Sequence, residues 1–196
     1  NQADYTFEAS SDGLRVTVTE VGTGDKDVVR GVETLTFSDG DIMVSHDDAL
    51  NRLVLTGTTG TDTITIVGSN PVTVFGVDGA DIIAGGGGDD LLKGSVGDDD
   101  ITGGAGNDTI DSGDGADLVT PGAGKDTVTL GAGKDTLVFS ADSDSAGANF
   151  DVVTDFVSGT DNLRLTHTML ATESVFTLSD KGDAASDGTA PGILDG

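Results

Sequence analysis

The sequence contains no cysteine and no tryptophan. Without thiols, the chain has no disulfide framework, zinc-thiolate centre, iron–sulfur cluster or cysteine nucleophile. Its aromatic residues are Tyr5 and seven phenylalanines, and it has only three prolines. No apolar run approaches the roughly 18 residues of a membrane-spanning helix. No signal-peptide pattern follows Asn1, so we expect an excised piece of a longer protein.

Basic residues are also scarce, with nine Lys and Arg against 35 Asp and Glu and a formal net charge of −26. Such a chain repels phosphate backbones, which excludes nucleic acid and anionic lipid as partners. Only four of the 35 acids are Glu (8, 20, 33 and 173), so 31 are Asp, and Gly also numbers 31. Disordered acidic tails are instead rich in Glu, Ser and Pro. The Asp and Gly content therefore indicates regular structure.

A nine-residue repeat occupies the middle of the chain. In every copy the fourth residue is Gly, the sixth is Asp and the eighth is aliphatic. The seven copies are GVDGADIIA (76–84), GGGGDDLLK (85–93), GSVGDDDIT (94–102), GGAGNDTID (103–111), SGDGADLVT (112–120), PGAGKDTVT (121–129) and LGAGKDTLV (130–138). A related copy, GTTGTDTIT (57–65), lies 19 residues before its counterpart, with the extra residue expected around Pro71.

The repeat predicts a coil of two loops and two short strands. Glycines in the first six positions favour a tight loop, and the aliphatic and Thr residues that follow favour a strand with one buried face. Two repeats close one coil of 18 residues, so about 3.5 coils stack over 76–138. Residues 18 apart then lie above one another in two columns. The Asp81 column holds Asp81, Asp99, Asp117 and Asp135, and the Asp90 column holds Asp90, Asp108 and Asp126.

Carboxylates stacked in this way need a counter-charge. At the parallel-strand spacing of about 4.8 Å, two neighbours repel by roughly 3–4 kcal/mol at an effective dielectric constant near 20. Lys93, Lys125 and Lys134 do not follow the period and are too few to neutralise the columns. A hard divalent ion fits the oxygen ligands, and Ca²⁺ tolerates irregular shells better than Mg²⁺. We therefore expect calcium binding and folding to be one event.

The nonapeptide G-G-x-G-x-D-x-U-x, where U is aliphatic, resembles the calcium-binding repeat of the RTX family. The resemblance implies an all-β fold, a right-handed parallel β-roll, with β-rich capping segments at both ends. It also implies that each calcium ion lies between loops 18 residues apart. The lower loop supplies the carbonyls of its second and fourth residues and its Asp, and the upper loop supplies the carbonyls of its first and third residues and its Asp.

Transferred to this sequence, the resemblance implies five interloop sites. On the Asp81 column, the first site joins Val77, Gly79 and Asp81 to Gly94, Val96 and Asp99. The second site joins Ser95, Gly97 and Asp99 to Ser112, Asp114 and Asp117. The third site joins Gly113, Gly115 and Asp117 to Leu130, Ala132 and Asp135. On the Asp90 column the first joins Gly86, Gly88 and Asp90 to Gly103, Ala105 and Asp108; the second joins Gly104, Gly106 and Asp108 to Pro121, Ala123 and Asp126.

Further sites are expected at the ends, for a total of about five to seven calcium ions. The outlying loop, through Gly60 and Asp62, is expected to pair with Gly76, Asp78 and Asp81. Asp144 falls on the nine-residue register and is expected to close a site with Gly122, Gly124 and Asp126. Asp151, Asp155 or Asp161 is the candidate ligand for a last ion.

The flanks are expected to be β-rich. We predict an N-terminal segment at 1–55, the repeat roll at 56–138 and a C-terminal cap and tail at 139–196. In the first segment, strand-like stretches at 5–7, 14–19, 28–32, 35–37 and 42–44 alternate with turn signals. In the last, 151–165 is expected to form strand, turn and strand. Phe150, Phe156, Leu163 and Leu165 are expected to close the open end of the roll.

No catalytic motif accompanies the repeats, so we expect a non-enzymatic module. There is no H-E-x-x-H or G-x-S-x-G sequence, and the paired acids follow the repeat rather than a glycosidase arrangement. The favoured interpretation is a calcium-responsive folding module of a secreted bacterial protein. The resemblance implies export by type I secretion machinery. Three alternatives remain. The first is an adhesin or surface-layer segment that contacts glycan or a cell surface. The second is a non-catalytic module of a secreted polysaccharide- or protein-degrading enzyme, and the third is a fragment with its own activity, for instance on polysaccharide beside an epimerase or lyase domain.

Overall fold

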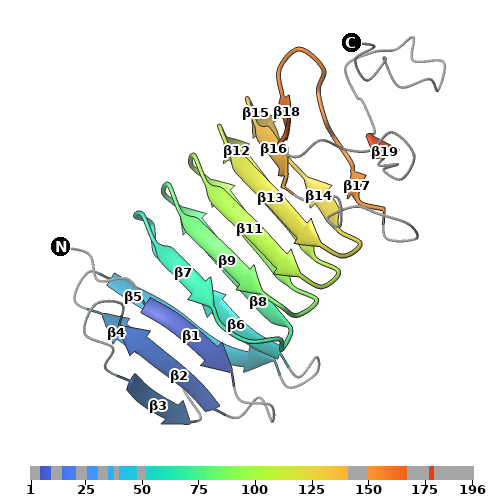
Figure 1. Cartoon of the computed structure of the whole chain (residues 1–196). Helices are drawn as coiled ribbons and strands as arrows, with labels where there is room; N and C mark the ends of the chain where they lie inside the picture. The colour runs from blue at the N-terminus through green and yellow to red at the C-terminus, as the bar shows by residue number, and fades with distance from the viewer. Residues whose placement is uncertain are drawn as a thin grey trace.

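The computed structural model describes residues 52–140 and 150–166, together with the strands at 5–9, 15–20, 26–30, 35–37, 40–47 and 177–178. Every regular element in these ranges is a β-strand, and none of them contains a helix that could span a membrane. The strands stack into an elongated roll, with the N-terminal strands at one end and the C-terminal strands at the other (Figure 1). The prediction of an all-β roll is confirmed.

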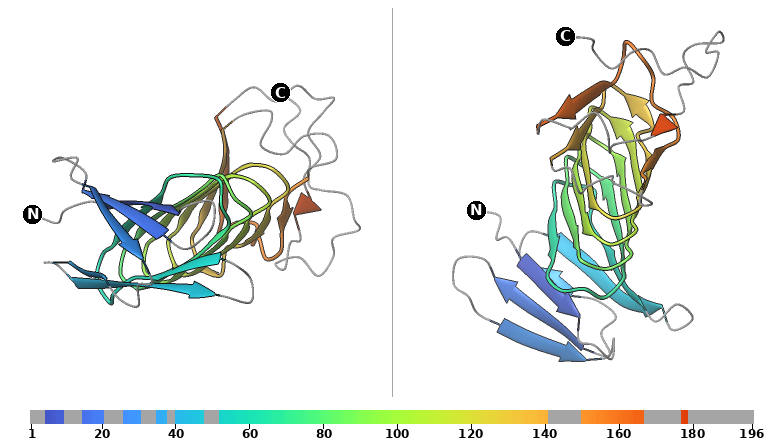
Figure 2. Two further views of the ribbon diagram at one scale, coloured as in Figure 1. Left: turned by 90° about the horizontal axis from the view of Figure 1, so that it is seen from below. Right: turned by 45° about the vertical axis from the view of Figure 1, so that its right-hand side comes forward.

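The chain alternates between two sheets as it winds. Viewed towards the end of the roll, successive coils lie behind one another (Figure 2). The repeat strands of the first sheet are β7 (Thr63–Ile66), β9 (Ile82–Gly86), β11 (Asp100–Ala105), β13 (Leu118–Ala123), β16 (Thr136–Phe139) and β18 (Asn162–Leu165). Those of the second are β6 (Arg52–Thr56), β8 (Val72–Asp78), β10 (Leu91–Val96), β12 (Thr109–Gly115), β14 (Thr127–Thr129), β17 (Val152–Val153) and β19 (Thr177–Leu178); the short β15 (Ala132–Gly133) pairs with β12.

The strand pairs from β8 to β14 in the second sheet and from β9 to β16 in the first are parallel and keep the 18-residue register. Leu92 of β10 lies between Val74 of β8 and Ile110 of β12. The aliphatic eighth residues all point inward and are at most 1 % exposed: Ile83, Leu92, Ile101, Ile110, Val119, Val128 and Leu137. Several strands continue into the first three residues of the next loop, so they are longer than predicted. The reason is that loop residues such as Ser95 and Val96 pair with the coils on either side.

The extra residue of the first coil lies close to its predicted place. Thr65 pairs with Ala84, an offset of 19, whereas Val72 donates its N–H to Asp90, an offset of 18. A Cβ built on Gly86 would be 3.1 Å from the carbonyl oxygens of both Ile66 and Gly68. The register therefore changes near Val67, which is about half exposed, rather than at Pro71.

Antiparallel strands extend both sheets at the N-terminal end. In the first sheet, β1 (Tyr5–Ala9) pairs in parallel with β7 and then antiparallel with β2 (Arg15–Glu20), which pairs with β3 (Lys26–Arg30). In the second, β6 pairs antiparallel with β5 (Gly40–Asp47), which pairs with β4 (Leu35–Phe37). The expectation of strands throughout the N-terminal flank is confirmed, within a few residues at each boundary.

The C-terminal strands continue the same two sheets. β17 and β18 are the predicted strand pair of 151–165, but each joins a different sheet. Phe156 and Leu163 pack on the apolar core, as expected. The same expectation was wrong for Phe150 and Leu165, which are both 37 % exposed. Phe150 precedes β17, and Leu165 lies on the edge strand of its sheet, so no further coil covers either within the described residues.

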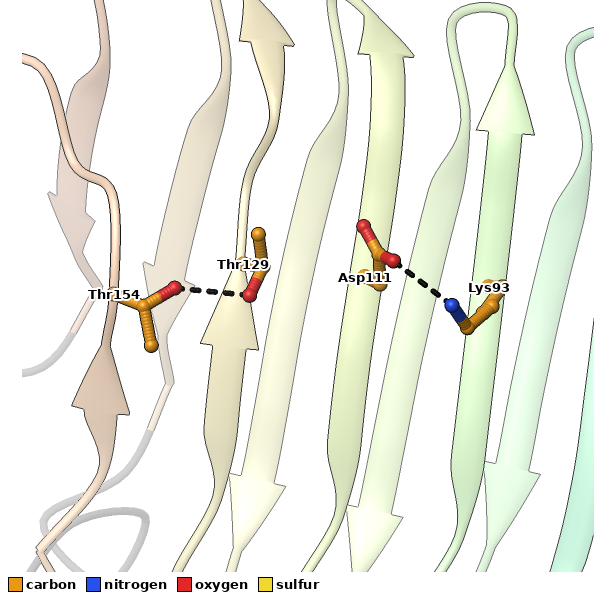
Figure 3. A network of polar contacts seen from close by, with 4 residues as sticks. All are labelled: Lys93, Asp111, Thr129 and Thr154. Atoms are coloured by element: carbon orange, nitrogen blue, oxygen red, sulfur yellow. Dashed lines mark hydrogen bonds and ion pairs between the residues drawn. The ribbon is translucent and has the colours of Figure 1, made fainter.

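The outer faces of the sheets carry polar rows. On the second sheet, the ammonium of Lys93 lies 3.1 Å from the carboxylate of Asp111 in the next coil. The hydroxyls of Thr129 and Thr154 lie 2.9 Å apart further along the same face (Figure 3). Both contacts are at least partly solvent-exposed, and the ion pair contributes little, about 0–1 kcal/mol. The stability of the roll must therefore come from its interior and from its loops.

Candidate metal centre

The loop aspartates form the two predicted columns. In each column the backbone N–H of one Asp donates to the Oδ1 of the Asp one coil later. Along the Asp81 column these N···O distances are 2.8 Å from Asp81 to Asp99, 2.9 Å from Asp99 to Asp117 and 3.0 Å from Asp117 to Asp135. Along the Asp90 column they are 2.9 Å from Asp90 to Asp108 and 2.8 Å from Asp108 to Asp126. One oxygen of each upper carboxylate is therefore fixed by the coil beneath it.

The second oxygen of these carboxylates has a different environment. Oδ2 of Asp81, Asp90, Asp99, Asp108 and Asp135 is buried and has no hydrogen-bond partner. The five side chains are at most 2 % exposed. A buried carboxylate oxygen without a donor is costly unless a positive charge lies beside it. This row of oxygens is the main indication of a cation site.

The pKa values of the column aspartates reflect the same burial. Burial raises the pKa of Asp81, Asp99 and Asp135 to about 6 and that of Asp90 and Asp108 to about 7, and the neighbouring carboxylates add to the rise. The N–H donated by the coil beneath opposes the rise in each case. Burial also raises the pKa of Asp117, where the Ser112 hydroxyl opposes the rise as well. That hydroxyl lies 2.7 Å from the Leu130 carbonyl oxygen.

In four of the loops the first residue is a glycine that lies between two oxygens. A Cβ built on Gly85 would be 2.7 Å from Oδ2 of Asp90 and 2.8 Å from the carbonyl oxygen of Gly103 in the next coil. Gly76, Gly94 and Gly103 have the same surroundings: the loop's own Asp and the first carbonyl of the coil above. Such a Cβ would require one of these oxygens to shift. Glycine therefore lets the carboxylate and the carbonyl oxygen of the next coil approach one another closely in these four loops, whereas the loops that begin with Ser112, Pro121 and Leu130 carry a Cβ at this position.

The carbonyls implied as ligands point into the same interloop space. The carbonyl of the third residue of the upper loop accepts the N–H of the fourth residue of the loop beneath. The N···O distance is 2.8 Å from Gly79 to Val96 and 2.9 Å from Gly106 to Ala123. From below, the carbonyls of the second and fourth residues face the coil above: those of Gly86 and Gly88 lie against Gly104 and Gly106. In these loops, carbonyls and column aspartates of successive coils therefore lie close together, and the full ligand set of the five interloop sites remains a prediction.

The donor set contains few acidic side chains per site. Within the described ranges, no group of three or more His, Cys, Asp or Glu side chains is arranged to hold a metal ion. Any ion between the loops would depend on two aspartates and on backbone carbonyls. This suits a hard ion with six to eight oxygen ligands and does not suit zinc or a transition metal.

The outlying loop at 57–62 is built differently. Asp62 does continue the Asp81 column, since its N–H donates to Asp81 Oδ1 at 2.8 Å. Its own Oδ2, however, accepts the Thr58 backbone N–H at 2.6 Å and the Thr58 hydroxyl at 3.0 Å. The structure therefore gives Asp62 donors of its own, where sequence reasoning expected an ion. In the sequence, the available signal for this difference was Thr58 at the second loop position, where most of the later loops have glycine.

The C-terminal cap also closes the columns with aspartates. Asp151 occupies the place expected for Asp144, since it accepts the Asp126 N–H at 2.8 Å; Asp144 itself lies outside the described residues. Asp161 accepts the N–H groups of Asp135, at 3.2 Å, and Val157, at 2.8 Å. The Asp155 carboxylate accepts those of Leu130 and Gly131, both at 2.8 Å. Asp155 and Asp161 therefore use both oxygens on backbone donors.

A second, exposed row of loop contacts was not predicted from the sequence. Asp89 accepts the Asn107 N–H at 2.7 Å, and the Asn107 side-chain oxygen accepts the Lys125 N–H at 3.0 Å. On the other edge, Asp98 accepts the Ala116 N–H at 2.8 Å. These are fifth-position residues, next to the column aspartates. They hold successive loops together through direct hydrogen bonds.

Comparison with known proteins agrees with this geometry. A family model described as the RTX calcium-binding nonapeptide repeat (4 copies) matches residues 75–110, 93–128 and 111–146. The comparison with curated proteins found no match. The three matched stretches overlap and include both columns from Asp81 and Asp90 onward. Several copies of the RTX calcium-binding nonapeptide repeat are therefore found across residues 75–146 of this chain.

Proposed function

We propose that the roll binds Ca²⁺ at the five interloop sites and that calcium binding and folding of the roll are one event. The observation that carries the proposal is the row of buried Oδ2 atoms without hydrogen-bond partners, four of which (those of Asp81, Asp90, Asp99 and Asp108) lie beside a carbonyl of the next coil. RTX repeats are calcium-binding modules of secreted proteins, which supports the choice of ion. Bound calcium supplies the positive charge that two facing carboxylates lack.

Each inner aspartate serves two sites in this proposal. Asp99 is the upper carboxylate of the first site on its column and the lower carboxylate of the second, and Asp108 has the same double role on the other column. The hydrogen bond from the coil beneath holds Oδ1 and so fixes the carboxylate orientation. Asp81, Asp90 and Asp135 each contribute to only one of the five sites. Gly122, Gly124 and Asp126 supply the lower half of a sixth site, and Asp151 supplies its upper carboxylate.

The charge of the chain supports calcium-dependent folding in an extracellular setting. At −26 the chain repels itself in the absence of cations. Calcium sites of extracellular proteins have dissociation constants of about 10⁻⁴–10⁻³ M. The calcium concentration of the cytosol is far too low to fill such sites. We propose that the module stays unfolded inside the bacterial cell, leaves through type I secretion machinery and folds in external calcium.

The test is a calcium titration of the whole chain followed by circular dichroism and size-exclusion chromatography. In chelator we expect loss of β signal and a larger hydrodynamic radius, because residues 57–138 unfold. About 10 mM calcium should restore a compact β state, since binding adds stability at each site. Magnesium at the same concentration is the control and should do much less. An equally compact β-rich chain in chelator and in calcium would refute the coupling of binding to folding.

A further inference from the structure

The second residue of each repeat loop has a left-handed backbone. The φ angles are 99° at Gly86, 115° at Gly104, 109° at Gly113, 100° at Gly122 and 86° at Gly131. Glycine adopts this conformation without cost. Two loops of the Asp81 column have other residues there: Val77 with φ of 91° and Ser95 with φ of 92°. No other non-glycine residue in the described part of the chain has a positive φ.

These two residues strain the loops they belong to. For an L-residue, positive φ brings Cβ against its own backbone, and a β-branched residue such as Val77 is the least tolerant. Ser95 has a second difficulty, because it stands over Val77 in the ladder. At the equivalent step, a Cβ built on Gly104 or Gly113 would collide with the carbonyl oxygen of the residue beneath. By analogy, we expect the Cβ of Ser95 to crowd the Val77 carbonyl in the coil beneath.

The strain falls on particular sites. In the proposed function, which this inference rests on, the carbonyl of the second residue is a ligand from the lower loop. Val77 and Ser95 fill that role in the first and second sites of the Asp81 column. Glycine fills it in the other three sites, at Gly113, Gly86 and Gly104. The two kinds of site share the same aspartates and differ in the backbone that presents the carbonyl.

We infer that the five interloop sites form two affinity classes, three tighter sites with glycine at the second loop position and two weaker sites with Val77 or Ser95. Strain exists only in the folded loop, so it lowers the apparent affinity wherever folding and binding are coupled. The usual cost of a non-glycine residue at positive φ corresponds to about a tenfold loss of affinity. Folding then accompanies the filling of the three tighter sites, and the two weaker sites, which lie on one edge, fill at a higher calcium concentration.

The test uses Val77→Gly and Ser95→Gly in the whole chain, with isothermal titration of calcium and native mass spectrometry to count bound ions. We expect two classes in the parent chain, separated by about tenfold. Each substitution should move one site into the tighter class, and the double variant should titrate as one class. Gly86→Ser tests the opposite direction. A Cβ there keeps 3.1 Å from its neighbours, so the chain should still fold and gain a third weak site.

Matched controls are Val67→Gly and Ser69→Gly. Both residues are exposed, lie outside the interloop sites and lack a positive φ. These two substitutions make the same chemical changes as Val77→Gly and Ser95→Gly. They measure the stability that is lost through the entropy cost of a new glycine, so neither should tighten a calcium site. A single class in the parent chain, or unchanged affinities in Val77→Gly and Ser95→Gly, overturns this inference and leaves the proposed function standing. No calcium binding by any variant overturns the proposed function itself.

Discussion

Asp99 and Asp62 belong to the same column and the same position of the repeat, yet their carboxylates have different partners. In both, the side chain is buried and the backbone N–H donates to the next Asp along the column. Oδ2 of Asp99 has no donor, whereas Oδ2 of Asp62 accepts two hydrogen bonds from Thr58. At the other end Asp161 is also satisfied by backbone N–H groups. The carboxylates in the middle of the column therefore lack a donor or positive charge for their second oxygen, whereas those at its ends are satisfied by hydrogen bonds.

This difference separates two ways of stabilising stacked acidic loops. The ends use hydrogen-bond donors of the chain, which are present in any solution. The middle depends on a cation, so its stability follows the calcium concentration. An aspartate in the repeat register is therefore not sufficient evidence of a calcium site. The donors within reach of its second oxygen decide between the two roles.

The largest expected effect is that of Asp99→Asn, which removes charge from the middle of the column. Asparagine can still accept the Asp81 N–H, so the coil contact survives, but two proposed sites lose a carboxylate. We expect two fewer bound calcium ions and a higher calcium midpoint for folding, measured by native mass spectrometry and circular dichroism. Asp100→Asn is the matched control, since Asp100 is exposed and off the column. Equal behaviour of the two variants would contradict the proposed role of the column.

The next effect concerns pH without calcium. The folded roll raises the pKa of Asp81, Asp99 and Asp135 to about 6 and that of Asp90 and Asp108 to about 7, from a value of 3.8. The folded chain therefore binds more protons than the unfolded chain between these values, so its stability rises as pH falls from about 7 towards 4. We expect more β signal in calcium-free buffer at pH 5 than at pH 8. A decrease would show that the columns do not limit the metal-free fold.

A smaller effect is expected at the C-terminal end from Asp155→Ala. The carboxylate accepts the Leu130 and Gly131 N–H groups, and each donor left unsatisfied costs about 1–3 kcal/mol. The free energy of unfolding in saturating calcium, from urea titration, should fall, while the number of bound ions stays the same. Asp100→Ala serves as control. Loss of a calcium ion in Asp155→Ala would place this residue among the metal ligands instead.

The smallest effect is expected from Thr58→Val at the other end. Valine has nearly the shape of threonine. It removes the hydroxyl that donates to Asp62 and accepts the Gly60 N–H at 3.1 Å, while the backbone N–H of residue 58 still donates to Asp62. Loss of one such bond costs about 1 kcal/mol, visible in urea titration at saturating calcium. The count of bound calcium should not change. An additional ion in this variant would mean that Thr58 masks a site.

The repeat made most of this architecture predictable. A fixed period places Asp81 beside Asp99 and Ile83 beside Ile101 whatever the loops do in detail, so the columns and the core follow from counting residues. Counting fails where the chain leaves the period. Asp126 donates to Asp151, 25 residues later and not 18, so Asp151 takes the place that counting assigns to Asp144. Likewise, burial of Phe150 depends on whether another coil follows, which a local pattern does not encode.

Other features depend on backbone conformation and not on spacing. Thr58 donates to Asp62 because its loop lacks the left-handed turn of the later loops. The strain at Val77 and Ser95 is invisible in the sequence until the second loop position is known to require a positive φ. Both features concern how a carbonyl or a donor is oriented. That information appears only once the coils are stacked.

The hydrogen bond from each Asp N–H to the carboxylate of the following coil gives the roll a direction. Every coil requires an acceptor from its C-terminal neighbour and offers one to its N-terminal neighbour. Asp161 and Asp151 meet this requirement for the last coil. Extra 18-residue units inserted in register should therefore lengthen the roll without altering either terminus, whereas truncation before residue 150 leaves the final coil with unmatched donors.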